Sequence, residues 1–339
     1  MEKNKQKRIY MDHAAAAPMD KRVRKAMEPY WTENFGNPNA IYKEGLIARS
    51  AIENAREDIA KILGARAKEI IFTNGGTESD NLAILGIARE AKQNFSRFTL
   101  PRNGAGSDAS QNFASPRLSA AFPLFHTDAC QAPGYLDINV ERLGVDLMTI
   151  NGSKIYGPKG IGLLYAKNGI KLEPLLYGGE QERKLRPGTE NVPAIIGLAE
   201  ALKIAEQERE KESARLVKLR DYFINRLLGE IPKTVLNGHP IQRLPNNINV
   251  SILDAEGESI VLYLDEAGAA CSTGSACTSE SLEPSHVILA IGKPHAYAHG
   301  AMRFSLGRST TKKDIDYVMK VLPDIIKKLR MFSPVNIKI

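Results

Sequence analysis

The stretch EIIFTNGGTESDNLAI, residues 69–84, decides the fold class because three local patterns follow one another in it. The apolar run 70–72 is typical of a short buried strand. Gly75 and Gly76 then predict a tight turn, and the polar residues 77–79 predict the start of a helix. In α/β proteins this order presents backbone N–H groups to a phosphate. The stretch therefore predicts an α/β fold with a phosphate-binding turn.

Strands and helices alternate on both sides of this stretch. A strand is expected in LFHTDACQAPG, residues 124–134, and two more flank the glycine-rich turn NGSKIYGPKG, residues 151–160. Gly64 is expected to cap the helix that precedes the opening stretch. Apolar residues at helical spacing predict helices over three segments, 48–64, 193–228 and 311–330. The alternation indicates the α/β class.

Composition excludes several classes of protein. The 339 residues are 43% hydrophobic and 25% charged, which is ordinary for a soluble enzyme. The net charge is +7, but acidic residues interrupt the basic ones along segments such as 209–223, so no nucleic-acid partner is expected. No apolar run approaches the ~20 residues of a membrane span. With no secretory signal at the N-terminus either, a cytoplasmic location is expected. Three cysteines without a CxxC pair predict neither a disulfide framework nor a zinc site.

Lys154 lies between two glycine-rich turns, where a lysine of fixed position could form a Schiff base with an aldehyde cofactor. Pyridoxal phosphate would also need a phosphate cradle, a carboxylate at its pyridine nitrogen and a partner for its ring oxygen. Candidates for these are the GGTES turn (75–79), Asp128 and Gln131. From the turn alone, a surface lysine without a chemical role is an equally good interpretation.

Taken together, these segments resemble the cysteine desulfurases of the NifS/IscS type, in the class V branch of the fold-type I pyridoxal-phosphate enzymes. The resemblance implies a large cofactor-binding domain over 18–211 with a mixed, mostly parallel sheet. It also implies a smaller α+β domain formed by 1–17 and 212–339. The motifs that carry it run through nearly the whole chain and include IYMDHAAAAP (9–18), FGNPNAIYKEG (35–45), VDLMTINGSKIYGPKGIG (145–162), RPGTENV (186–192) and STGSACTSESLEPSHVILAIG (272–292).

The resemblance implies a role for each cofactor-binding position. Lys154 is similar to the Schiff-base lysine, Asp128 to the aspartate that keeps the pyridine nitrogen protonated, and Gln131 to the partner of the phenolic oxygen. Thr189 resembles a phosphate contact that the second subunit of a homodimer donates. The positions expected around the phosphate and beside the lysine are Gly76, Thr77, Asn151 and Ser153.

Cys277 lies among small polar residues in GAACSTGSACTSES, residues 268–281, which predicts an exposed, mobile loop. It resembles the cysteine that takes sulfur from L-cysteine as a persulfide and leaves L-alanine. Arg303 resembles the arginine that binds the substrate carboxylate, and arginine suits a bidentate grip. The implied function is a desulfurase that hands sulfur to an acceptor or scaffold protein for iron–sulfur clusters or tRNA thiolation.

The chain departs from the family pattern between 82 and 127, where it is several tens of residues shorter. The family's ring-stacking histidine, in an EHHA-like motif, and an asparagine near the ring oxygen have no counterpart here. The segment 96–123 shows no regular period, so we expect an irregular linker there and a central sheet that lacks some strands. Two alternatives follow: a catalytically impaired pseudoenzyme, or another class V lyase such as a selenocysteine lyase.

Overall fold

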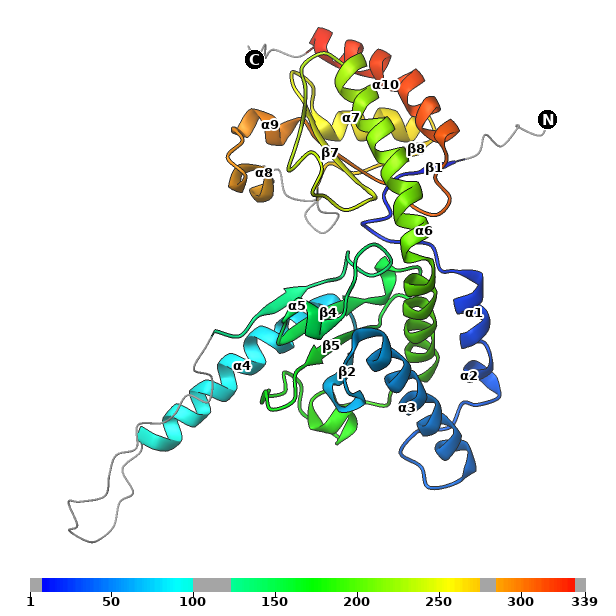
Figure 1. Cartoon of the computed structure of the whole chain (residues 1–339), viewed down its shortest axis with the longest axis vertical. Helices are drawn as coiled ribbons and strands as arrows, with labels where there is room; N and C mark the ends of the chain where they lie inside the picture. Colours follow the sequence, from blue (N-terminus) through cyan, green and yellow to red (C-terminus); the bar gives the residue numbers. More distant parts are fainter. Residues whose placement is uncertain (1–7, 100–122, 275–284, 333–339) are drawn as a thin grey trace. The chain divides into compact units, whose positions relative to one another are not determined.

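The computed structural model describes residues 8–99, 123–274 and 285–332, with the backbone alone over 93–99. The chain divides into two compact units, each with its own hydrophobic core (Figure 1). The larger unit consists of Met19–Pro133 and Asp137–Glu206, and the smaller unit of Met1–Pro18, Gly134–Leu136 and Gln207–Ile339. No helix in these described ranges is both long and apolar enough to cross a membrane.

The described sheet of the larger unit has the strand order β2-β5-β4-β3, with β2 (Ile70–Thr73), β5 (Gly162–Ala166), β4 (Leu147–Asn151) and β3 (His126–Asp128). β3 and β4 are parallel, whereas β5 is antiparallel to both of its neighbours. The mixed sheet was expected, but it holds fewer parallel pairs than expected. The reason is that β5 follows β4 through a short turn, which is too short for a parallel crossover.

Side chains of β2 alternate between the two faces of this sheet. Ile70 and Phe72 belong to a core that α3 (Lys43–Leu63) and the first half of α6 (Val192–Glu230) cover. Ile71 faces the opposite way, into a smaller core beneath α4 (Gly76–Thr99). The strand between two helical layers is therefore buried on both faces, which explains why its sequence is a continuous apolar run.

Two predictions about the helices of this unit have different outcomes. The predicted C-cap is confirmed, because Gly64 follows α3 in the left-handed conformation, with φ 67°. The predicted irregular linker 96–123 is wrong in its first four residues, which continue α4 to Thr99. Adding one residue to an existing helix is much more favourable in free energy than starting a new helix. The helix therefore continues through residues 96–99 although their apolar periodicity is weak. Residues 100–122 of that segment lie outside the described residues.

The remaining elements of the larger unit are short. They are α1 (Lys21–Met27), α2 (Pro29–Thr32), η1 (Ala67–Glu69), α5 (Val140–Leu143), η2 (Gly152–Lys154) and η3 (Gln181–Lys184).

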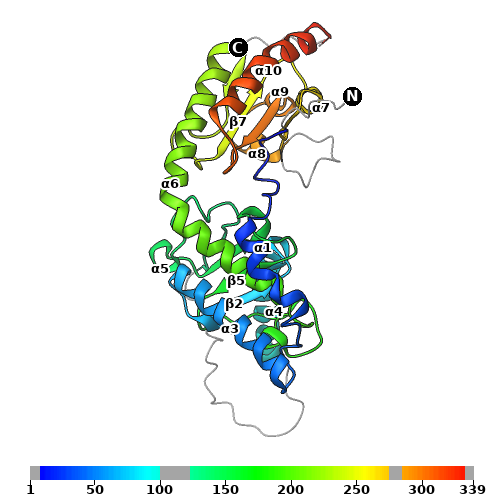
Figure 2. The same cartoon turned by 90° about the vertical axis from the view of Figure 1, so that its right-hand side faces the viewer.

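The smaller unit packs helices against an antiparallel sheet of order β6-β7-β9, formed by β6 (Thr234–Leu236), β7 (Asn247–Ile252) and β9 (Ala301–Ser305) (Figure 2). The second half of α6 and α10 (Lys312–Phe332) supply much of its core, which confirms the helices predicted over 193–228 and 311–330. A short parallel pair joins the N-terminal segment to this unit. The other elements are β1 (Ile9–Tyr10), α7 (Gly257–Glu266), β8 (Ala269–Ala270), α8 (His286–Ala290) and α9 (His295–His299).

Candidate active site

The carboxyl ends of three strands of the larger unit meet at one edge of the sheet. β2 and β4 are both antiparallel to β5 and therefore run in the same direction, and β3 is parallel to β4. Thr73, Asp128 and Asn151 are the last residues of these strands. Ligands of α/β proteins bind outside such carboxyl ends. The fold thus brings the glycine turn, the Asp128 segment and the Lys154 turn to one place.

The glycine turn after β2 disfavours side chains at both glycines, at Gly75 by its backbone conformation and at Gly76 by lack of space. Gly75 has φ 146°, which other residues rarely adopt. A Cβ atom on Gly76 would lie 2.9 Å from the Cys130 Sγ and 3.6 Å from the Asn151 Nδ2. α4 begins at Gly76, so the first N–H groups of the helix have no partner within it. Thr77, the next residue, has an exposed side chain. The turn therefore offers bare backbone and a hydroxyl next to Asn151.

Asp128 is exposed at the tip of β3, and its Oδ1 accepts a hydrogen bond of 2.9 Å from the Cys130 backbone N–H. Burial raises the pKa of the Cys130 thiol, and so do a hydrogen bond with Asp128 and the charges of Asp128 and Asp80. The charge of the Lys154 ammonium opposes these effects. Gln131 is half-buried in the turn that follows. Cys130 is therefore a neutral packing group beside the Asp128 carboxylate.

Lys154 closes a rigid turn at the end of β4. The Asn151 Oδ1 accepts hydrogen bonds of 3.0 Å from both the backbone N–H and the hydroxyl of Ser153. The Gly157 N–H donates to the Gly152 carbonyl at 2.9 Å, and Tyr156 has a positive φ of 62°. These bonds fix the backbone from which the Lys154 side chain projects. The sequence indicated the turn, but not that Asn151 and Ser153 would be bonded to each other.

Thr189 lies exposed in the loop that leads into α6. The Glu182 carboxylate anchors the start of this loop, because it pairs with the Arg56 guanidinium at 2.6 Å and accepts the Phe72 N–H at 2.8 Å. Arg186 ties the loop to the first turn of α4 through an Nε–Oε1 contact of 3.2 Å with Glu78. Sequence reasoning missed Glu182 as a structural anchor, because nothing in QERK marks a buried charge.

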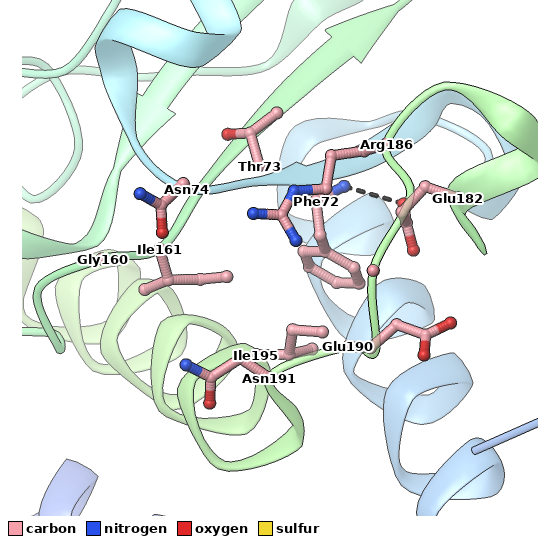
Figure 3. Close-up of a pocket in the computed structure, with 11 residues that line it drawn as sticks. Phe72, Thr73, Asn74, Gly160, Ile161, Glu182, Arg186, Glu190, Asn191 and Ile195 are labelled. Carbon is pink, nitrogen blue, oxygen red and sulfur yellow. Dashed lines mark hydrogen bonds between the residues drawn. The ribbon is translucent and has the colours of Figure 1, made fainter. Parts of the chain in front are cut away.

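A pocket of about 140 Å³ lies between this loop, the end of β2 and the start of α6 (Figure 3). The loop contributes Arg186 and Glu190, and the end of β2 contributes Asn74. Figure 3 shows the Phe72 N–H directed at Glu182 on the wall of this pocket. Its other lining residues are Thr73, Gly160, Ile161, Gly188, Asn191 and Ile195. Thr189 is thus flanked by two residues of a polar pocket.

Arg303 belongs to the smaller unit, on β9. Its Nη2 donates to the Asp12 Oδ1 at 2.9 Å. Both side chains are mostly buried, with 16% of Arg303 and 15% of Asp12 exposed. The Arg303 Nε is buried and bonds to no other described residue. Backbone hydrogen bonds in both directions join Arg303 to Ser272, which lies within the predicted cysteine loop, residues 268–281. Asp12 is a second site residue that the sequence analysis did not single out.

Cys277 and the rest of the segment 275–284 lie outside the described residues. Cys271, just before this segment, is buried in the core of the smaller unit. Burial raises the pKa of its thiol to about 12, which leaves the unreactive thiol form at neutral pH.

The residues at the edge of the larger unit's sheet fit the needs of pyridoxal phosphate. They include a lysine on a rigid turn, a carboxylate at a strand tip and a glycine turn at which a Cβ would clash. All three belong to the same compact unit. The bare backbone at Gly76 provides the kind of cradle that a phosphate uses.

The family model for aminotransferase class-V matches residues 9–100 and 118–318, so the chain belongs to this family. It is 45% identical to the cysteine desulfurase IscS of Methanosarcina thermophila, over 98% of this chain and 95% of the relative. It is 44% identical to the cysteine desulfurase IscS of Dictyoglomus turgidum, over 96% of each chain. A solved structure described as a NifS-like protein superposes with a TM-score of 0.80 at 27% identity, over 95% of this chain and 100% of that chain. The fold is that of the fold-type I pyridoxal-phosphate enzymes.

The comparisons also bear on the shortened region. The family match is interrupted between residues 100 and 118. The alignment with the Methanosarcina protein spans 385 positions, more than the 339 residues of this chain. The relative therefore has residues without a counterpart here. The interruption falls inside the segment in which the sequence predicts the shortening.

Proposed function

We propose that the chain is a pyridoxal-phosphate-dependent cysteine desulfurase, which converts L-cysteine to L-alanine and keeps the sulfur as a persulfide on Cys277. One observation carries the proposal. The glycine turn, Asp128 and Lys154 converge at one edge of a sheet, in a chain that is 45% identical to a protein named cysteine desulfurase. The sequence-based interpretation as a desulfurase agrees with the family to which the chain belongs.

The residues of the larger unit would hold the cofactor at three points. Lys154 would bind its aldehyde carbon, Asp128 would keep its ring nitrogen protonated, and the backbone at Gly76 with the Thr77 hydroxyl would bind its phosphate. Gln131 would contact the ring oxygen. When bound, pyridoxal phosphate supplies an electron sink for the bonds broken at the substrate. The rigid turn around Lys154 supports this role, because a fixed lysine needs no reordering before it reacts.

The sulfur transfer is assigned to Cys277. Its thiolate attacks the sulfur of the bound cysteine and forms the new S–S bond. The bond between that sulfur and the substrate Cβ breaks, and its electron pair stays with the carbon skeleton, which gains protons and leaves as alanine. Arg303 would bind the substrate carboxylate, and its contact with Asp12 supports this role by orienting the guanidinium. A sulfur acceptor or cluster-scaffold protein would then remove the sulfur, in the cytoplasm.

We further propose that the enzyme is a homodimer, with Thr189 donated to the cofactor phosphate of the partner. Exposed apolar side chains on the larger unit support association with a second copy of this chain. They include Trp31 at 60%, Phe35 at 69% and Ile41 at 90% relative exposure, and beside them a groove of about 590 Å³ is lined by Leu46 and Ile47 among others. Several large apolar side chains exposed close together in the sequence are the kind of surface that an interface covers. Sedimentation of a stable, cofactor-loaded monomer would contradict the dimer.

Two alternatives remain distinguishable by assay. A selenocysteine lyase would release alanine from L-selenocysteine in preference to L-cysteine. A pseudoenzyme, favoured by the missing ring-stacking histidine, would bind the cofactor without turnover. His126 is a poor replacement for that histidine, since its Nε2 is 3.0 Å from the Thr149 Oγ1 and 3.6 Å from the Asp80 Oδ1.

The test is single-turnover alanine formation from L-cysteine, preceded by borohydride reduction and peptide mapping of the loaded protein. Mapping should place the cofactor on Lys154, and a label on Lys159 or Lys167 would contradict the assignment. Wild type should form alanine slowly, because general acid–base help is worth about 10²–10⁴-fold in rate and one of its usual donors is missing. Cys277→Ser should abolish persulfide without loss of cofactor. A loaded, folded wild type that forms no alanine would favour the pseudoenzyme.

A further inference from the structure

A chain of polar side chains joins three elements beneath the candidate cofactor site. Thr149 on β4 is 0% exposed, and its Oγ1 lies 3.0 Å from the Nε2 of His126 on β3. The same His126 Nε2 lies 3.6 Å from the Oδ1 of Asp80 on α4. Burial raises the pKa of the Asp80 carboxyl group, and the Thr149 hydroxyl opposes this effect. The imidazole of one strand therefore contacts a hydroxyl of the next strand and a carboxyl group of a helix.

The ends of this chain lie beside two parts of the proposed cofactor site. Side chains alternate along a strand, so His126 and Asp128 point to the same face of β3. Thr149 is the register partner of Asp128, which places the hydroxyl next to the strand tip. Asp80 follows Gly76 by four residues, about one helical turn. The chain thus spans from the strand tip at Asp128 to the first turns of α4.

The Thr149 hydroxyl holds the His126 imidazole whichever tautomer is present. A threonine hydroxyl has one proton to donate and can also accept, so it bonds an Nε2 that donates or one that accepts. Serine at this position would preserve the bond to His126, and valine would preserve the shape but lose it.

We propose that Thr149, through Asp80 and His126, is a positioning residue that sets the distance between Asp128 and the glycine turn at Gly76. In the proposed function these groups bind opposite ends of one rigid cofactor, its ring nitrogen and its phosphate. The inference rests on the proposed function only for the identity of the ligand. The contacts among Thr149, His126 and Asp80 are formed by the protein itself, without a ligand. A rigid ligand held at two ends is sensitive to small errors in their separation.

Thr149→Val is the test, with Thr149→Ser as the conservative variant. We expect T149V to weaken pyridoxal phosphate binding about tenfold, the size that the loss of one buried hydrogen bond produces, and to shift the absorption band of the bound cofactor. T149S should bind within about twofold of wild type. The matched control is Thr234→Val, in the smaller unit, because the Thr234 Oγ1 is buried and bonds to no other described residue. T234V should leave cofactor binding unchanged.

A second measurement needs no cofactor. In the NMR spectrum of the cofactor-free protein, T149V should move the amide signals of Asp128 and Gly76 and the imidazole signals of His126, whereas T149S should not. If wild type fails to bind pyridoxal phosphate, the proposed function fails and these signals still decide the positioning role. Unchanged Asp128 and Gly76 signals in T149V, or wild-type affinity in T149V, would overturn the inference.

Discussion

The Arg56 guanidinium and the Glu182 carboxylate form an ion pair of 2.6 Å inside the larger unit, with 5% and 4% of their side chains exposed. The Arg56 Nη1 also donates to the Ile70 carbonyl, and its guanidinium lies over the Phe72 ring. Glu182 has a positive φ of 47° and begins a run of three such residues, 182–184. This pair holds a strained loop against β2, and the same loop carries Thr189.

We predict that Glu182→Gln destabilises the protein by about 3 kcal/mol, because it leaves the buried Arg56 charge with only the exposed Glu53 as a counter-ion. Urea unfolding measures this loss. The exposed pair of Glu180 and Lys184 provides the control, and Glu180→Gln should give no measurable change. If E182Q unfolds like wild type, the ion pair does not anchor the loop.

Gly76→Ala should destabilise the glycine turn by about 1–3 kcal/mol through overpacking. The reason is steric, since the new Cβ would lie 2.9 Å from the Cys130 Sγ. Cys130→Ala removes that sulfur, so the double variant should recover most of the stability and of the cofactor affinity. Thermal unfolding and cofactor titration of the single and double variants measure both. A double variant no better than G76A would show that a contact other than the Cys130 sulfur forbids a side chain there.

Asp12→Ala should raise the cysteine concentration needed for half-maximal turnover roughly tenfold, because Arg303 loses the carboxylate that orients it. Asp12→Asn should have a smaller effect, since its amide oxygen can still accept from the Arg303 Nη2. Steady-state kinetics on the loaded enzyme separate the Michaelis constant from the turnover number. Tighter cysteine binding in D12A would mean that Asp12 competes with the substrate instead of orienting its arginine.

His13 makes the smaller unit sensitive to acid. Burial lowers the pKa of its imidazole from 6.5 to about 4. Between pH 6.5 and about 4, the His13 imidazole is therefore protonated in the unfolded chain but neutral in the folded chain. The free energy of unfolding keeps its full value above pH 6.5 and decreases as the pH falls through that range. Between pH 7 and 5 the loss should be about 2 kcal/mol.

The measurement is urea unfolding at both pH values, with His13→Gln as the control that removes the titrating group. A glutamine variant is expected to lose about 2 kcal/mol less than wild type over the same pH interval. An equal loss in both proteins would show that other groups cause the acid sensitivity.

Local patterns allowed much of the larger unit to be predicted. The apolar run before Gly75 is β2, the polar residues after it begin α4, and Gly64 ends α3 with the left-handed φ that glycine permits. The turns around Asp128 and Lys154 could also be predicted. An apolar strand followed by glycine or polar residues indicates a turn, and this pattern occupies only a few neighbouring positions. Each of these features depends on neighbours in the sequence, so one chain is enough to see it.

The sequence by itself thus determined the class of fold, the order of the elements and which short segments carry the candidate chemistry. The tertiary structure alone decided how these segments meet: that β5 lies antiparallel between β2 and β4, that Glu182 reaches Arg56, that Asp12 meets Arg303, and that Thr149 meets His126. Each of these contacts joins residues that are distant along the chain. Burial of a charge or a hydroxyl is stabilising only when a partner arrives from another element, and no local pattern records which partner that is.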